Sequence, residues 1–169
     1  MITKDKIVED LITKLLSKYK AEGSNISRKP SPFMKEALLV QKNAPFLNIN
    51  SYLYFLSEMS VLLVTLKNNS FLMIYGLDDW DEGLNILDYP IPGENGFHLV
   101  MDITNSDGEI LYFSYNSAFP KEDALWMARD VNGGEGTYSK TEWGFVDVLS
   151  LISEEKMDFQ QLRNTTNNI

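Results

Sequence analysis

Apolar and polar residues alternate most regularly in the middle of the chain, and the pattern there predicts a β-hairpin. Every second side chain from residue 97 to residue 103 is apolar, which puts one apolar row on a strand face: Phe97, Leu99, Met101 and Ile103. A second apolar run covers residues 110–113, and Asn105-Ser106-Asp107-Gly108 between the two runs has the side chains of a tight turn. We expect this hairpin at the centre of a sheet.

Helical spacing predicts four further elements. An amphipathic helix is expected over residues 4–20, ended by Gly23-Ser24-Asn25, and a short helix from Pro32 to about Val40 with Ser31 as its cap. A third helix is expected over residues 51–59 with Asn50 as its cap. The closing helix has a possible capping box in Ser139 and Glu142, and one apolar face: Phe145, Val148, Leu149 and Ile152.

The remaining apolar runs predict more strands. Residues 61–66 and 71–75 flank a polar tetrapeptide and indicate a second hairpin, so an antiparallel meander is the simplest topology. Residues 124–131 fit either a strand or a helical turn, residues 132–136 are expected to be irregular, and the tail from Gln160 is expected to be frayed. The fold class expected is α+β: one domain over residues 1–169, with an antiparallel or mixed sheet of about four to six strands and helices packed around it.

Composition excludes several kinds of site. The chain has 169 residues and no cysteine, which excludes disulfides, thiolate zinc sites and cysteine nucleophiles. The N-terminus enters a charged periodic segment without the apolar stretch of a signal peptide, and no apolar run approaches the length of a membrane span. We therefore expect a cytoplasmic protein that does not contact a membrane.

The negative charge is concentrated in one part of the chain. The formal net charge is −9, and residues 68–120 contain nine carboxylates and no lysine or arginine. Direct binding to nucleic acid is disfavoured, because phosphate contacts need a basic surface. A cationic partner is the natural counterpart of this segment.

The densest acidic stretch contains Asp78, Asp79, Asp81 and Glu82 around Trp80. Hard cations bind groups of carboxylates, but the spacing does not fit an EF-hand loop, and a solvated acidic loop is the simpler interpretation. Tryptophan is enriched at the centres of interfaces, so Trp80 is a candidate anchor for a partner; half-burial against the protein's own sheet is the alternative.

Other candidate chemistry is weaker. His98 is the chain's single histidine and has no recognisable catalytic partner set, so a structural role is favoured. The glycines at 133, 134 and 136 lack the Gly-Lys-Ser/Thr ending of a phosphate loop. A pair of carboxylates acting as acid and base stays open. We expect no catalytic residue, no metal and no cofactor.

The order of several motifs resembles the SUKH superfamily, which includes fungal regulators of cell-wall assembly and bacterial toxin-immunity proteins. The similar features are a helix with Tyr52, Phe55 and Leu56, the strand end Ile74-Tyr75-Gly76-Leu77, the entry Pro-Ile-Pro-Gly-Glu-Asn-Gly-Phe to the strand with Asp102, the return strand Gly108-Glu109-Ile110, and the helix of residues 145–149. The resemblance covers residues 45–155 and implies an α+β domain without catalytic residues, which in immunity members binds a toxin and blocks it.

Charge and resemblance lead to one hypothesis. The chain is expected to be a non-enzymatic binding domain, an immunity protein that neutralises a basic toxin domain such as a nuclease through an acidic surface. The partner-binding residues expected from charge are Asp78, Asp79, Trp80, Asp81, Glu82 and Glu94. Two alternatives stay open: a regulatory or scaffolding module for an endogenous protein, and a small carboxylate-dependent hydrolase.

Overall fold

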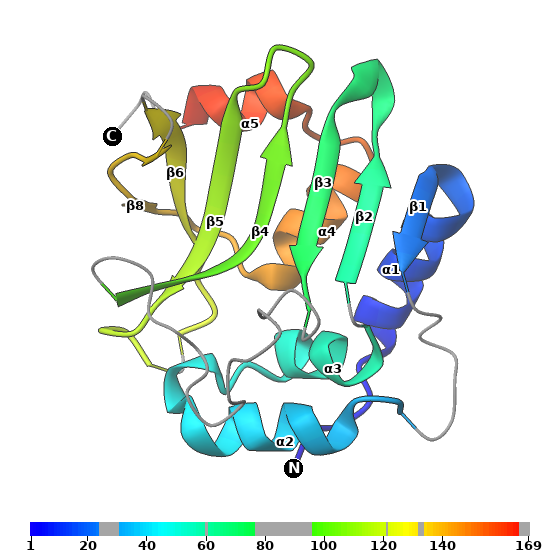
Figure 1. Cartoon of the computed structure of the whole chain (residues 1–169), viewed down its shortest axis with the longest axis vertical. Coiled ribbons are helices and arrows are strands. Elements are labelled where there is room, and N and C mark those ends of the chain that lie inside the picture. Colours follow the sequence, from blue (N-terminus) through cyan, green and yellow to red (C-terminus); the bar gives the residue numbers. More distant parts are fainter. Residues whose placement is uncertain (24–30, 60, 77–95, 121, 132–133, 166–169) are drawn as a thin grey trace.

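An antiparallel sheet forms the centre of the molecule (Figure 1). The computed structural model describes residues 1–23, 31–59, 61–76, 96–120, 122–131 and 134–165. Within these residues, seven strands are hydrogen-bonded in chain order, and an eighth pairs with β6. The strands are β1 (Lys20–Gly23), β2 (Val61–Thr65), β3 (Phe71–Tyr75), β4 (Phe97–Thr104), β5 (Ile110–Asn116), β6 (Trp126–Val131), β7 (Gly134–Glu135) and β8 (Ser139–Lys140).

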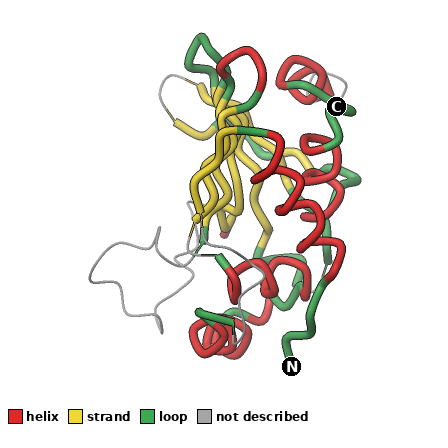
Figure 2. Tube along the Cα trace, turned by 90° about the vertical axis from the view of Figure 1, so that its right-hand side faces the viewer, coloured by secondary structure: helices red, strands yellow, loops and turns green. Residues whose placement is uncertain are grey.

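The helices cover one side and one end of this sheet. They are α1 (Lys6–Lys18), α2 (Met34–Asn43), α3 (Asn50–Glu58), α4 (Phe145–Ser153) and α5 (Phe159–Thr165), with short 3-10 turns at Pro45–Leu47 and Lys67–Asn69. Figures 1 and 2 show α1, α4 and α5 on one side of the sheet and α2 and α3 across its lower end. The α+β prediction is confirmed, with more strands than the four to six expected.

The core lies between the sheet and the helices on its covered side. Alternate residues of the strands point into it, as the period of two requires: Leu62 and Val64 of β2, and Leu72 and Ile74 of β3, are fully buried. The apolar stripes of α1 and α4 cover them with Val8, Leu11, Ile12, Leu15, Phe145, Val148, Leu149 and Ile152. Burying each such side chain contributes about 1.5–3 kcal/mol, so this layer holds the helices on the sheet.

The central hairpin is confirmed, but its apolar row is split. The β4–β5 turn is made as predicted: Asn105 Oδ1 accepts hydrogen bonds from the backbone N–H groups of Asp107 and Glu109, and Gly108 has a φ of 84°. The pairing of β4 with β5 shifts between Leu99 and Met101. This β-bulge turns Leu99 to the face opposite Met101. The prediction of one continuous row was therefore wrong, because a bulge leaves no mark in the alternation itself.

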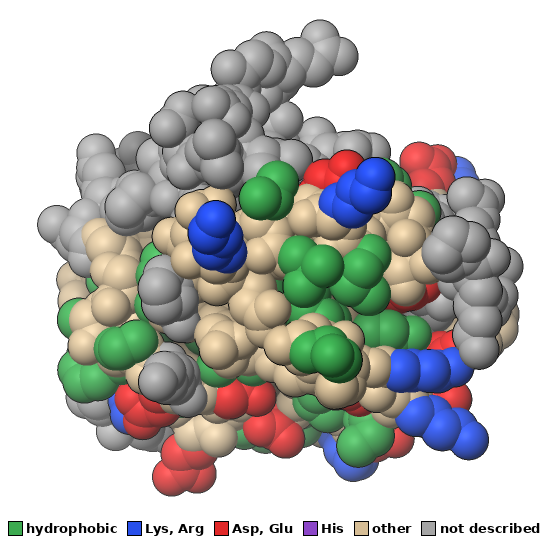
Figure 3. Space-filling view, turned by 90° about the horizontal axis from the view of Figure 1, so that it is seen from below, with side chains coloured by type: hydrophobic (Ala, Val, Ile, Leu, Met, Phe, Trp, Pro, Cys, Tyr) green, Lys and Arg blue, Asp and Glu red, His purple; other side chains and the backbone are tan. Residues whose placement is uncertain are grey.

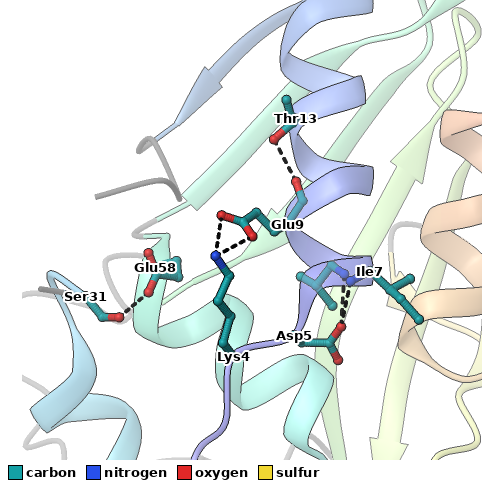
Figure 4. A network of polar contacts seen from close by, with 8 residues as sticks. Lys4, Asp5, Ile7, Glu9, Thr13, Ser31 and Glu58 are labelled. Carbon is teal, nitrogen blue, oxygen red and sulfur yellow. Dashed lines mark hydrogen bonds and ion pairs between the residues drawn. The ribbon is translucent and has the colours of Figure 1, made fainter. Parts of the chain in front are cut away.

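Two predicted helix caps serve tertiary contacts instead. Ser31 does not cap α2, which begins at Met34; its hydroxyl donates a hydrogen bond to the buried carboxylate of Glu58 (Figure 4). Asn50 does not cap α3; its amide oxygen accepts hydrogen bonds from the backbone N–H and the hydroxyl of Thr3. Both polar side chains tie segments distant in sequence to the helices, which local patterns do not reveal.

The first helix ends earlier than predicted. Asp5 caps α1 by accepting hydrogen bonds from the N–H groups of Ile7 and Val8, as Figure 4 shows. The helix ends at Lys18, and residues 20–23 form β1 against β2. The prediction that Gly23 ends the helix was wrong, because pairing with the sheet edge takes over these residues.

The closing helix starts from a different cap than predicted. The backbone N–H of Phe145 donates to Asp123 Oδ1 at 3.1 Å, and the N–H of Gly144 donates to Asp147 Oδ2 at 2.8 Å. Ser139 lies in β8, so the proposed box of Ser139 and Glu142 does not form. The apolar face of α4 is buried as predicted.

The C-terminal third contains more regular structure than expected. Residues 126–131 form a strand, which settles the ambiguity over residues 124–131. Gly134–Glu135 pairs with β6, so this part of the segment expected to be irregular is a short strand. Gln160–Thr165 belong to α5, whose Leu162 is buried, so the predicted fraying was wrong for these residues. Within the described residues, no helix combines the length and apolar character that crossing a membrane needs.

Candidate functional site

The residues singled out by charge lie outside the described part of the chain. Asp78, Asp79, Trp80, Asp81, Glu82 and Glu94 all fall within residues 77–95. The described residues on either side, Gly76 and Gly96, follow β3 and precede β4, which are paired neighbours. The acidic segment is therefore joined to the centre of the sheet, and the described surface around this junction becomes the candidate site.

One side of the sheet has no described helix on it. In Figure 2 the described helices beside the sheet lie to its right, and in Figure 1 the side of the sheet without a described helix faces the viewer. Because cross-strand partners share a face, the register gives the side chains on this side. We call them the open face: Lys20, Glu22, Val61, Leu63, Thr65, Phe71, Met73, Tyr75, Phe97, Leu99, Asp102, Thr104, Ile110, Tyr112, Ser114, Asn116, Trp126 and Ala128.

The open face is largely apolar and aromatic. Phe71 and Leu63 are 43% and 37% exposed, and they lie on the adjacent strands β3 and β2. Met73 lies between them on the same face, directly opposite Leu63. Single exposed apolar residues are ordinary, but a contiguous group across neighbouring strands marks an interaction surface.

A carboxylate lies in the middle of this apolar surface. Asp102 of β4 pairs in register with Met73 on one side and Tyr112 on the other. The hydroxyl of Tyr75 donates a hydrogen bond to Asp102 Oδ2. No lysine or arginine nitrogen in the described part of the chain lies within 4 Å of this carboxylate.

Burial raises the pKa of Asp102. Loss of water raises the pKa of its carboxyl above the ordinary 3.8, and the hydrogen bond from Tyr75 opposes part of this rise. A half-buried carboxylate with no cation beside it among the described residues is costly in free energy, and such groups concentrate at functional sites.

An aromatic cluster extends the open face toward β6. The ring of Phe97 stacks on Tyr138 with centroids 4.1 Å apart, and the ring of Trp126 lies 5.6 Å from both Phe97 and Phe119. Phe119 is 46% exposed, and Lys140 Nζ lies 5.6 Å from its ring centroid. Large rigid aromatic side chains of this kind lose little conformational entropy on binding and supply much contact area.

His98 supports the site from the covered side. The Tyr52 hydroxyl lies 3.4 Å from both His98 Nε2 and the backbone oxygen of Tyr75. Burial lowers the pKa of His98 to about 3, so the imidazole is neutral at ordinary pH. This geometry agrees with the structural role expected for His98: it joins α3 to the ends of β3 and β4.

A second apolar patch lies on α2. Leu38 and Leu39 are 42% and 37% exposed, and Figure 3 shows hydrophobic side chains on this lower face with lysine or arginine side chains around them. The exposed Lys35 and Lys42 belong to the same helix. The open face has Asp102 at its centre, and its Lys20 and Glu22 lie on the edge strand β1. The lysines of α2 therefore make the α2 patch a poorer match for a basic partner.

A pocket of about 500 Å³ lies at the opposite end of the sheet from α2, between the two hairpin turns and α5. Glu155 at its wall accepts a hydrogen bond from the Tyr19 hydroxyl at 2.8 Å and pairs with Lys67 at 2.7 Å and Lys18 at 3.2 Å. These contacts hold the pKa of Glu155 near 2. They give its carboxylate a structural task, joining the α4–α5 connection to α1 and the β2–β3 turn.

The comparisons with protein-family models, curated proteins and solved structures found no match to this chain. The site therefore rests on its own geometry. Sequence reasoning missed Tyr75, Tyr112 and the role of Asp102, although one signal was present. Residues 61–64 and 71–75 are apolar on both alternating sets, so both faces of these strands are apolar.

Proposed function

We propose that the chain is a non-enzymatic protein-binding domain, an immunity protein that neutralises a cognate bacterial toxin by direct binding. The observation that carries the proposal is the open face: a contiguous apolar and aromatic sheet surface around Asp102. Interfaces of high affinity combine central aromatic anchors with few, well-placed charges.

The sign of the charge supports a basic partner. The net charge is −9, and Asp102 is one of the nine carboxylates of residues 68–120. A negative surface accelerates encounter with a positively charged protein, and burial of the apolar surface then slows dissociation. A nuclease domain, which is basic where it contacts phosphates, is the partner that this combination favours.

Site-specific cross-linking in the native host tests the proposal. A photoreactive residue is placed at Met73 on the open face, and in a matched variant at Leu38 on α2. We expect one polypeptide to cross-link from position 73 and not from position 38. Equal cross-linking from the two positions, or none from position 73, contradicts the open face as the binding surface.

Growth then tests neutralisation. The captured polypeptide is expressed alone and together with the wild-type chain in a bacterial host. We expect growth arrest in the first case and normal growth in the second. A captured protein that does not impair growth contradicts the immunity function and leaves the regulatory alternative.

A further inference from the structure

The strand β1 lies at one edge of the sheet and has a charge pattern that is complementary to itself. We propose that two copies of the chain pair through β1, antiparallel about a two-fold axis between their Ala21 residues, so that Lys20 of each copy lies opposite Glu22 of the other. This inference goes beyond the proposed function, because it concerns a second surface and a partner that is the chain itself.

The outer side of β1 is suited to receive another strand. Figure 1 shows β1 as the last arrow of the sheet, and within the described residues it pairs with β2 alone. The backbone of residues 20–23 makes no further hydrogen bond to another described residue. In an antiparallel strand with one neighbour, alternate N–H and C=O groups point away from that neighbour. Such groups are the template on which a partner adds a strand.

The charged side chains of β1 lie on one face. Lys20 and Glu22 are opposite Thr65 and Leu63 of β2, so both belong to the open face, and both are exposed. Neither side chain forms an ion pair within the described part of the chain. Opposite charges directly across from each other on neighbouring strands stabilise the strand pair. The described residues therefore leave both charges to a partner strand.

The charges select one register for two identical strands. With Ala21 opposite Ala21 of the other copy, Lys20 lies opposite Glu22 on both sides of the axis. Moving the register by two residues places Lys20 opposite Lys20, or Glu22 opposite Glu22, and like charges in these positions are destabilising. Moving it by one residue pairs the open side of one strand with the covered side of the other, which the strand pleat does not allow. The favoured register is the self-complementary one that a two-fold interface requires.

The covered side of β1 also favours a second strand. Tyr19 and Ala21 pack against the core but are only partly buried, and a neighbouring strand removes more of their apolar surface from water. Ala21 is small, so at the axis it lets the two backbones approach closely. The two-fold axis is perpendicular to the sheet, so the open faces of the two copies lie on the same side of the joined sheet.

Sedimentation velocity over a wide concentration range measures the association. Because β1 has only four residues, the interface is small, and we expect the wild-type dimer at the higher concentrations. The measurement is made at physiological ionic strength, where charges farther apart than about 8 Å are largely screened, since the net charge of −9 on each copy opposes association. A wild-type chain that stays monomeric at the highest concentration overturns the inference.

Charge reversal then tests the Lys20–Glu22 pairs. Lys20→Glu and Glu22→Lys each place like charges across the axis, so each variant alone is expected to associate at least about tenfold more weakly than wild type. An equimolar mixture of the two restores unlike charges at both pairs and is expected to form mixed dimers as tightly as wild type. The control is Lys35→Glu on the exposed side of α2, which changes the net charge as Lys20→Glu does and is expected to weaken association less than about twofold. A dimer that both reversals leave unchanged, or a mixture that does not associate, overturns the inference.

A disulfide tests the register. The chain has no cysteine, so Ala21→Cys introduces a single thiol in each copy. Because the two copies of residue 21 lie directly opposite each other in the proposed register, we expect this variant to oxidise to a covalent dimer faster than Asp107→Cys, whose thiol lies in the exposed β4–β5 turn. Equal rates of dimer formation in the two variants contradict the proposed pairing.

Discussion

The hydroxyl of Tyr75 on β3 donates a hydrogen bond to the carboxylate of Asp102 on β4, in the middle of the open face. The pair joins the two strands from which residues 77–95 leave and return. Tyr75 stabilises the charged form of Asp102, but burial outweighs it and the pKa stays raised. Burial thus disfavours the charged form of Asp102 in the folded protein.

Replacing Asp102 changes the pH dependence of stability. Because its folded pKa is raised, the carboxyl contributes stability below the ordinary value of 3.8, and that contribution is lost as pH rises through the folded pKa. The Asp102→Asn variant has no carboxyl at this position, so it does not lose this contribution to stability as pH rises. The stability of the variant relative to wild type is therefore expected to increase from pH 3 to pH 7, measured by urea unfolding. A difference that is constant or falls with pH contradicts the raised pKa.

Replacing His98 changes a different pH window. Its pKa is lowered by burial from 6.5 to about 3. The contribution of His98 to stability is therefore fully present above pH 6.5 and is lost as pH falls toward 3. Between pH 6.5 and 5, wild type is expected to lose up to about 1.4 kcal/mol per pH unit more than His98→Gln. Urea unfolding across this window measures it, and parallel curves for the two proteins contradict a buried neutral imidazole.

Asp123 is expected to be the polar residue that fixes the start of α4. Its Oδ1 accepts hydrogen bonds from the N–H of Phe145 and, at 2.8 Å, from the hydroxyl of the buried Tyr115. Asp123→Ala removes a cap and leaves a buried hydroxyl without its acceptor, so we expect a loss of about 2–4 kcal/mol in the free energy of unfolding. The exposed Glu142 is the control, and Glu142→Ala is expected to cost less than about 0.5 kcal/mol. Equal losses of stability in the two variants would contradict Asp123 as the residue that fixes the start of α4, and would favour the capping box of Ser139 and Glu142 expected from the sequence.

Neutralising the acidic segment tests the sequence-based site separately from the open face. With Asp78, Asp79, Asp81 and Glu82 changed to amides, association with the cross-linked partner is expected to slow about tenfold or more at low salt, and its salt dependence to flatten. Stopped-flow mixing at several ionic strengths measures both. Unchanged association and an unchanged salt dependence remove these residues from the site.

The sequence predicts elements whose signal is local and periodic. Both hairpins follow from apolar runs around turn residues, and the buried face of α4 follows from its helical spacing. It does not predict β1 or the bulge after Leu99, because strand pairing decides both. The hydroxyl of Ser31 and the carboxylate of Asp123 serve partners distant in sequence, which no local capping rule includes.

The site was predictable only in part. Charge counting finds the acidic segment, whose residues lie outside the described structure. It gives Asp102 no special place among nine carboxylates, because burial and the contact with Tyr75 distinguish it. The open face can be recognised only from the positions of the helices. A strand that is apolar on both faces has the same sequence pattern whether helices cover one face or both.

The affinity of the cross-linked partner for two double variants tests the central claim, that the open face is the binding surface. Leu63→Ser/Phe71→Ser alters the open face, and Leu38→Ser/Leu39→Ser alters α2; the two pairs have closely matched exposure, 37% and 43% against 42% and 37%. Because central apolar contacts dominate binding energy, titration calorimetry should show at least about tenfold weaker binding for the first variant and less than twofold for the second. Full affinity in Leu63→Ser/Phe71→Ser, or the loss confined to the α2 variant, would contradict the account.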